Sequence, residues 1–171
     1  MQRLNKDFFV RDVLDVAPDL LGKVIVRKFD NGEIKKFVIT ETEAYCGEED
    51  LACHASKGKT KRTETMYMEG GHIYIYLIYG MYYMLNFVTS HKDNPQAVLI
   101  RGVDNVIGPG RVGKILQIDK SFNKQSILTS DNFWIEQGEI EKLKYRTDVR
   151  VGIDYAGEYW KNRPWRFILK K

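Results

Sequence analysis

Residues 72–89, HIYIYLIYGMYYMLNFVT, carry the strongest folding signal in this chain. Two runs rich in tyrosine, isoleucine and leucine meet there at Tyr79-Gly80-Met81, and side chains of these types favour strands. Glycine tolerates the positive φ angle of a tight turn. The pattern therefore predicts a β-hairpin with Gly80 in its turn.

Further stretches extend this hairpin into a sheet. The Asn31-Gly32 pair predicts a second hairpin, and Gly108-Pro109-Gly110 predicts the start of a short helix. Residues 46–71 keep no period of 2 or 3.6, which predicts a long loop of the kind that is functional or disordered. Runs that favour strands cover residues 23–29, 34–45, 96–103, 133–136, 149–153 and 164–169. We expect an α+β fold with a largely antiparallel sheet.

The composition is that of an ordinary globular protein. The 171 residues fit one domain, 1–171, and 43% hydrophobic with 29% charged residues argues against disorder. No apolar run reaches the length of a membrane span, and the first residues, MQRLNKDFFVRD, lack the apolar core of a signal peptide. We therefore expect a cytoplasmic protein without a membrane partner.

The positive charge is unevenly distributed. The net charge is only +4, but residues 54–63 hold four basic residues and residues 159–171 hold five, with no acidic residue in either segment. A basic face of this kind suits a polyanionic partner such as nucleic acid. The basic C-terminal stretch is nevertheless expected to be a solvated edge strand, with DNA contact as the alternative.

The two cysteines, Cys46 and Cys53, exclude a disulfide framework and lack the spacing of a zinc site. Cys53 precedes His54, but adjacent side chains on an extended chain point apart, which argues against a thiol nucleophile. We expect both thiols to be reduced and no metal to be bound.

Polar side chains in apolar strands predict a pocket. In the strand 34–45, alternation places Glu41 and Glu43 on the face of Phe37 and Ile39. Arg101 stands within AVLIRGV and must find a buried anion, for which Glu41 or Glu43 is the obvious partner. Asn86, in a third strand, also needs partners. These groups describe either a convergent pocket or an ion pair without chemistry.

Six of the ten tyrosines lie between positions 67 and 83. They suit either ordinary strand packing or a surface on which nucleobases stack. Tyr79 favours the second interpretation, because an aromatic side chain at a turn has little core to fill. A protruding aromatic beside a basic loop resembles the wedges that pry base steps apart from the minor groove.

Five segments, in this order, resemble the alkyladenine DNA glycosylase family, also called 3-methyladenine DNA glycosylases. The resemblance covers nearly the whole chain from Leu20 onward, and the first two segments are long and specific. They are ETEAYCGEEDLACHASKGKTKR, HIYIYLIYGMYYMLN, AVLIRG, GPGRVGKILQIDKSF and VGIDYAGEYWKNRPWRF.

The resemblance implies a single domain with a curved antiparallel sheet, flanking helices and a protruding hairpin, like the C-terminal domain of formyltransferases. It implies a base-excision repair enzyme that flips a damaged purine out of double-stranded DNA and hydrolyses its N-glycosidic bond. Substrates of this class are 3-methyladenine, 7-methylguanine, hypoxanthine and ethenoadenine. The enzyme is expected to be a monomer that leaves an abasic site, without a cofactor or lyase activity.

Roles follow residue by residue from the matching motifs. Glu43 corresponds to the general base, and Arg101 with the backbone of Val151 to the groups that hold the attacking water. The remaining matches are the pocket walls Tyr45, His54 and Tyr76, the floor residue Asn86, the intercalating Tyr79, and the phosphate contacts Lys59 and Arg62.

Three departures and two alternatives accompany the resemblance. The connection from Arg101 to Gly108 is shorter than in the family, Thr63 replaces a common asparagine, and Lys59 replaces a common arginine, which changes phosphate contacts. A non-catalytic nucleic-acid-binding module on a similar fold is the main alternative, but it needs no buried carboxylate beside an arginine. A nuclease is a weaker one, since no clear cluster of metal-binding carboxylates is present.

Overall fold

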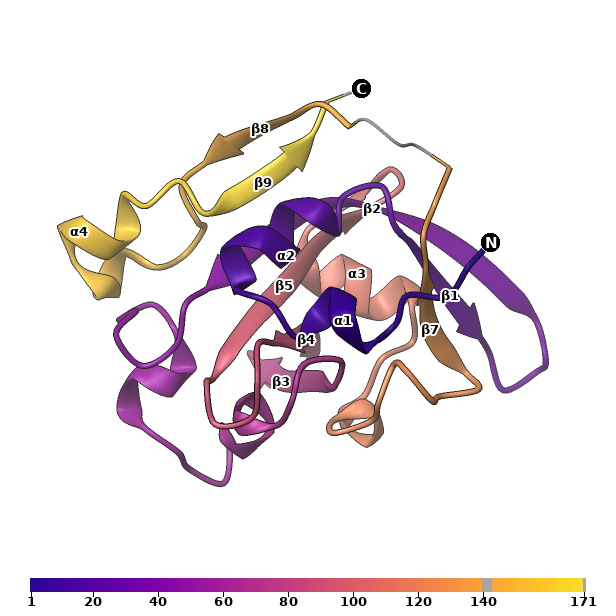
Figure 1. The fold of residues 1–171 in the computed structure, drawn as a ribbon, viewed down its shortest axis with the longest axis horizontal. Helices are drawn as coiled ribbons and strands as arrows, with labels where there is room; N and C mark the ends of the chain where they lie inside the picture. Colours follow the sequence, from indigo (N-terminus) through magenta and orange to yellow (C-terminus); the bar gives the residue numbers. More distant parts are fainter. Residues whose placement is uncertain (140–142, 171) are drawn as a thin grey trace.

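The computed structural model describes residues 1–139 and 143–170 (Figure 1). It confirms the α+β class with a large antiparallel sheet and few helices. The helices are α1 (Lys6–Phe9), α2 (Val13–Asp19), α3 (Pro109–Ile115) and α4 (Glu158–Lys161), with 3-10 turns at His54–Lys57, Glu64–Tyr67, Lys120–Phe122 and Asp154–Ala156. The strands are β1 (Val24–Lys28), β2 (Ile34–Tyr45), β3 (Ile73–Ile78), β4 (Tyr82–Thr89), β5 (Gln96–Val103), β6 (Val106–Ile107), β7 (Phe133–Glu136), β8 (Tyr145–Asp148) and β9 (Arg166–Leu169).

Strand β2 is the centre of the sheet. The main path runs β3-β4-β5-β2-β1-β7, and β2 pairs along one edge with β5. Its other edge pairs first with β1 and then, from Glu41 to Glu43, with β9. The hairpin of β8 and β9 therefore extends the sheet beside the second half of β2 (Figure 1). This topology places Glu41 and Glu43 between β5 and β9.

The sheet has two apolar faces. On one face, side chains such as Ile75, Leu85 and Ile100 share the main core with residues of α1, α2 and α3. On the other face, Tyr74 and Val88 form a second cluster with residues from the loop 46–71. Residues therefore alternate along β3, β4 and β5 between the helix-covered core and the face that carries the site.

A double irregularity in β2 corrects one sequence prediction. Glu41 and Glu43 do not share the face of Phe37 and Ile39, because the register between β2 and β5 shifts on both sides of Glu41. Phe37 and Ile39 lie in the main core, whereas beyond the shift it is Ala44 that joins this core. A bulge of this kind re-aims the side chains that follow it. It turns the two carboxylates away from the helix-covered core.

The segment 149–153 is not a strand, contrary to the sequence prediction. Pairing with β9 ends at Asp148, and Gly152 has a positive φ of 74°. The amide of Val149 donates to the Asp148 carboxylate, and its carbonyl accepts from the side chain of Arg166. The valine and isoleucine residues of this segment favour a strand, but side chains, not a neighbouring strand, form these hydrogen bonds with its backbone.

The hairpin between β3 and β4 is confirmed. Tyr79 and Gly80 both have positive φ, 52° and 63°, and the amide of Met81 donates to Ile78 at 3.1 Å. These angles are those of a type I′ turn, the form that suits the twist of a hairpin. A tyrosine in this conformation is strained, and strain of this kind is common at functional sites.

None of the helices in residues 1–139 and 143–170 has the length and apolar character that a membrane-spanning segment needs.

Candidate active site

A cavity of about 320 Å³ opens on the second face of the sheet. The neighbouring strands β2, β3, β4 and β5 form its base, and the loops 46–71 and 149–155 close its sides. Eight of the predicted site residues line it: Tyr45, His54, Arg62, Tyr76, Tyr79, Asn86, Arg101 and Val151. Its size is that of a small-molecule pocket, and its lining is mostly apolar and aromatic.

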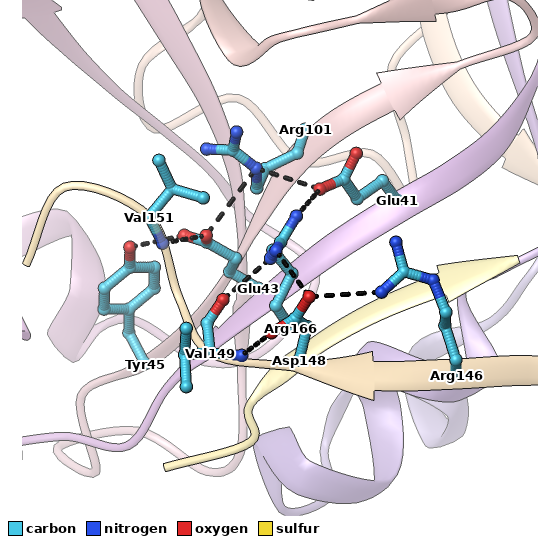
Figure 2. A network of polar contacts seen from close by, with 9 residues as sticks. All are labelled: Glu41, Glu43, Tyr45, Arg101, Arg146, Asp148, Val149, Val151 and Arg166. Carbon is cyan, nitrogen blue, oxygen red and sulfur yellow. Dashed lines mark hydrogen bonds and ion pairs between the residues drawn. The ribbon is translucent and has the colours of Figure 1, made fainter. Parts of the chain in front are cut away.

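Glu43 lies fully buried beside this cavity, at 0% exposure. One carboxylate oxygen, Oε1, accepts from the amide of Val151 at 2.8 Å, and Oε2 accepts from the hydroxyl of Tyr45 at 2.7 Å (Figure 2). Burial raises the pKa of Glu43, although Arg101, these two donors and Arg150 act in the opposite direction. The carboxylate is thus held by donors and made more basic by burial, as a general base requires.

Arg101 lies between both carboxylates that the sequence offered as its partner. Its Nε is 3.2 Å from Glu41 Oε1 and 3.6 Å from Glu43 Oε1. Arg101 is also the residue at which the register of β5 shifts against β2. The guanidinium lines the cavity, so it serves both as a countercharge and as a donor to whatever binds there.

Aromatic rings form the cavity walls. The rings of His54 and Tyr76 meet edge to face, with centroids 4.5 Å apart, and His54 Nδ1 is 2.9 Å from the hydroxyl of Tyr74. Burial raises the pKa of Tyr74 to about 12, and it raises that of Tyr76 as well. Both phenols are therefore neutral at pH 7, and their rings offer apolar surfaces for stacking.

His54 gives the stability of the protein a pH dependence. Burial, with Arg62 and Lys57 nearby, lowers its pKa from 6.5 to about 4. Between these pH values the unfolded chain binds a proton that the folded chain does not, so the free energy of unfolding falls as the pH drops. We expect a loss of about 2 kcal/mol from pH 6.5 to 4, measured by urea unfolding.

The matched variants isolate this contribution. His54→Gln should flatten that part of the stability curve, whereas the exposed His91→Gln should keep the wild-type curve. A His54→Gln curve parallel to the wild-type curve would show that His54 binds its proton normally in the folded protein.

Asn86 occupies the base of the cavity. It is only 3% exposed, and its Nδ2 donates to the carbonyls of Tyr74 and Met84 at 3.3 and 3.4 Å. Both acceptors belong to the surrounding strands, and the amide also lines the cavity. Its position is therefore fixed by the sheet, as a residue that selects ligands by shape requires.

The two basic residues predicted to contact phosphates lie in different environments. Arg62 lines the cavity, with its guanidinium carbon 5.8 Å from the centre of the Tyr76 ring. Lys59 is exposed outside the cavity, with its ammonium 5.6 Å from the ring of Tyr67. Tyr79 is 87% exposed and lines the mouth. Tyr79 and Arg62 are thus parts of the cavity lining, whereas Lys59 lies outside it.

Sequence reasoning missed a buried ion pair behind the cavity wall. The side chains of Asp50 and Arg150 are both 0% exposed, with Nη1 and Oδ2 2.6 Å apart and Nη2 and Oδ1 3.0 Å apart. The guanidinium also lies 4.9 Å from the ring centres of Tyr45 and Trp165. Nothing local marks these residues, because they are 100 positions apart and lie in a segment predicted to be a long loop and in one predicted to be a strand.

Arg166 was also missed. The sequence places it on a predicted solvated edge strand, yet its side chain is 18% exposed and turns toward Glu41, with Nη1 3.0 Å from Oε1 (Figure 2). Only the pairing of β9 with β2 could reveal this.

In the described part of the chain, no group of three or more histidine, cysteine, aspartate or glutamate side chains is arranged to hold a metal ion.

Comparison with known proteins finds one family model and several relatives that are named as DNA glycosylases. The family model described as methylpurine-DNA glycosylase matches residues 7–107 and 103–171. A protein of Borreliella burgdorferi (strain ZS7) is 41% identical over 179 residues, which cover 98% of this chain and 96% of that protein. Proteins of Natranaerobius thermophilus and Legionella pneumophila (strain Corby) are 39% and 41% identical over 98% and 99% of this chain, and 96% of each is covered. Each is named "Putative 3-methyladenine DNA glycosylase".

Proposed function

This chain belongs to the methylpurine-DNA glycosylase family, and we propose that it hydrolyses the N-glycosidic bond of a damaged purine flipped out of duplex DNA. The single observation that carries the proposal is Glu43, a fully buried carboxylate held by two donors beside an aromatic cavity. Burying a carboxylate is costly, and a protein that only binds DNA gains nothing from it. The cost is understandable if the carboxylate is a base.

The first step is entry of the base into the cavity. Extracting a base costs a few kcal/mol of stacking, least where the base is damaged or mispaired. Tyr45, His54 and Tyr76 offer aromatic faces in return, and neutral His54 adds no positive charge. Alkylation makes a purine cationic, and a cation is attracted to an aromatic face. The cavity therefore favours alkylated purines.

The second step is hydrolysis. Glu43 takes a proton from water, the water oxygen bonds to C1′ of the sugar, and the bond from C1′ to the purine nitrogen breaks. The electron pair of that bond passes to the base, whose positive charge it neutralises. Arg101 and the amide of Val151 hold the water and the carboxylate in place. One carboxylate then suffices where ordinary glycosidases use two, since the second normally protonates the leaving group.

Deaminated or etheno-purines such as hypoxanthine and ethenoadenine are neutral, so they depart less readily. We propose them as substrates of the same cavity, with the alkylated purines 3-methyladenine and 7-methylguanine released faster. We propose that the protein acts as a monomer without lyase activity; among residues 1–139 and 143–170, no lysine lines the cavity to form a Schiff base with the sugar. The product is therefore a free base and an intact abasic strand.

Tyr79 is expected to fill the gap that the flipped base leaves. Its exposure, its strained turn and the exposed Met81 beside it suit a wedge that enters the minor groove. Arg62, in the cavity lining, and the exposed Lys59 are proposed to contact the phosphates.

The test is incubation of the protein with duplexes that carry one 3-methyladenine analogue, 7-methylguanine, hypoxanthine or ethenoadenine. We expect release of the free base and an abasic site that alkali cleaves, with no strand break before alkali. A protein that binds these duplexes but releases no base from any of them is a binding module, the alternative class.

Tyr79→Ser is expected to weaken flipping about 10-fold or more while leaving the hydrolytic step intact, because base stacking on an aromatic side chain contributes about 1–3 kcal/mol. The fluorescence of 2-aminopurine next to the lesion measures flipping, and single-turnover rates at saturating protein measure hydrolysis. Tyr145→Ser, at an exposed site on β8, is the control. Equal flipping by Tyr79→Ser and the wild type would refute the wedge.

A further inference from the structure

Arg166 connects three parts of the site through one guanidinium (Figure 2). Its Nη1 is 3.0 Å from Glu41 Oε1, its Nη2 is 3.0 Å from Asp148 Oδ2, and its Nε donates to the carbonyl of Val149 at 2.7 Å. The planar fork of an arginine fits three acceptors in fixed directions, which no other side chain does. These contacts join β9 to β2 and to the chain that leaves β8.

The contact to Val149 reaches the catalytic carboxylate through the backbone. Val149 is two residues before Val151, whose amide donates to Glu43 at 2.8 Å. This segment has no strand partner, so the side chain of Arg166 replaces the hydrogen bond that a neighbouring strand would supply. Arg166 therefore fixes the direction of the amide that holds Glu43.

The ion pair between Arg166 and Glu41 affects Glu43 electrostatically. Glu41 is 5% exposed and shares its Oε1 between Arg166 and Arg101. Arg101 is closer to Glu41, at 3.2 Å, than to Glu43, at 3.6 Å. The two carboxylates therefore compete for Arg101, and Arg166 decides how strongly Glu41 competes.

We propose that Arg166 and Glu41 are positioning residues that set the basicity of Glu43 in opposite directions. This inference rests on the proposed role of Glu43 as a base. Without the charge of Glu41, Arg101 is released to Glu43 and makes it a weaker base. Without Arg166, Glu41 draws on Arg101 alone, and Glu43 becomes harder to ionise.

Replacing Arg166 or Glu41 by glutamine removes one charge of this pair, while the other surroundings of Glu43 stay constant. Arg101 is the cation that this pair controls, and Tyr45 remains on β2 beside Glu43. The other polar groups around it are Arg150 and the Val151 amide in the segment 149–153, Tyr76 on β3 and Tyr155 beyond β8. A shift in the ionisation midpoint of Glu43 whose direction follows the sign of the removed charge is therefore due to Arg166 and Glu41 alone.

The experiment measures the ionisation midpoint of Glu43 by NMR of protein labelled with 13C at glutamate side-chain carboxyls, with Glu43→Gln assigning the signal. We expect Arg166→Gln to raise this midpoint and Glu41→Gln to lower it, each by about half a pH unit or more. The acid limb of single-turnover base release should move in the same two directions. Arg146→Gln is the matched control, since Arg146 also contacts Asp148 but neither Glu41 nor Val149, and it should leave the midpoint unchanged.

A second readout separates the backbone contact from the charge. Arg166→Lys keeps a cation beside Glu41 but cannot span Val149 as well, so the midpoint should return to the wild-type value. The rate on the pH-independent plateau should stay about 10-fold low, because the Val151 amide is no longer fixed. If Arg166→Gln does not fold, the test rests on the lowered midpoint of Glu41→Gln and on the low plateau rate of Arg166→Lys.

Midpoints that move in the same direction in Arg166→Gln and Glu41→Gln, or that move no more than in Arg146→Gln, overturn the inference, and so does a wild-type plateau rate in Arg166→Lys. The NMR midpoint needs no activity. A wild-type protein that releases no base refutes the proposed function, whereas the titration still decides whether Arg166 and Glu41 control Glu43.

Discussion

Glu43→Gln is expected to slow release of an alkylated purine by about 10²–10⁴-fold, the usual contribution of a general base. Glutamine keeps the size of the side chain and can still accept a hydrogen bond from the Val151 amide, but it cannot take a proton from water. Single-turnover assays with saturating protein and a 7-methylguanine duplex measure the rate. Because the aromatic cavity and Tyr79 are unchanged, binding of the lesion duplex, followed by fluorescence anisotropy, should stay within about 3-fold of the wild type, a free-energy change below about 1 kcal/mol.

The control for this variant is Glu33→Gln, an exposed carboxylate in the turn between β1 and β2 whose ion pair with Lys35 is half exposed. It removes the same charge away from the cavity and should keep the wild-type rate. A Glu43→Gln rate within a few-fold of the wild type would assign the base to another residue. Loss of binding together with loss of rate would mean that Glu43 supports the cavity instead.

Asp50→Ala is expected to lower the free energy of unfolding by about 3–5 kcal/mol, because it leaves Arg150 as an uncompensated charge in the interior. Asp50 also accepts from the amides of Cys46 and Ala52, at 3.0 and 3.1 Å, and these bonds are lost as well. Urea unfolding followed by circular dichroism measures the change. The loss is a large share of the 5–15 kcal/mol that a domain of this size possesses.

Two further variants identify the cause. Glu64→Ala breaks an ion pair with Lys124 that lies at the surface, and it should leave the free energy of unfolding close to the wild-type value. Replacing both members, Asp50→Leu with Arg150→Met, should recover much of the loss, since it removes the unpaired charge. A loss below 1 kcal/mol in Asp50→Ala would show that water reaches Arg150.

The ion pair of Asp50 and Arg150 contributes to stability and also contacts the backbone around the site. Arg150 bonds to the carbonyl of Ala44, next to Glu43 and Tyr45, and precedes Val151, whose amide holds Glu43. The pair thus joins the loop 46–71 to the segment 149–153 across the back of the cavity wall. Arg166 contacts the same segment at the carbonyl of Val149, so two arginine side chains anchor the chain immediately before the Val151 amide.

The sequence by itself determined the hairpin, the antiparallel sheet and most of the cavity. Strand periodicity and turn glycines are local properties, so they survive without knowledge of the fold. Arg101 and Asn86 were found because a polar group in an apolar strand needs a partner wherever the strand lies. The family resemblance then gave each residue a role, and the structure places eight of these residues around one cavity, with Glu43 buried beside it.

Only the tertiary structure decided which way the carboxylates face and what holds them. The register shifts around Glu41 depend on how β2 meets β5, and alternation within β2 predicted the wrong face. Asp50, Arg150 and Arg166 look like surface charges in sequence, because their partners are between 100 and 125 positions away. Ion pairs between distant segments leave no periodic signal in either one, and they form only when the sheet brings the strands together.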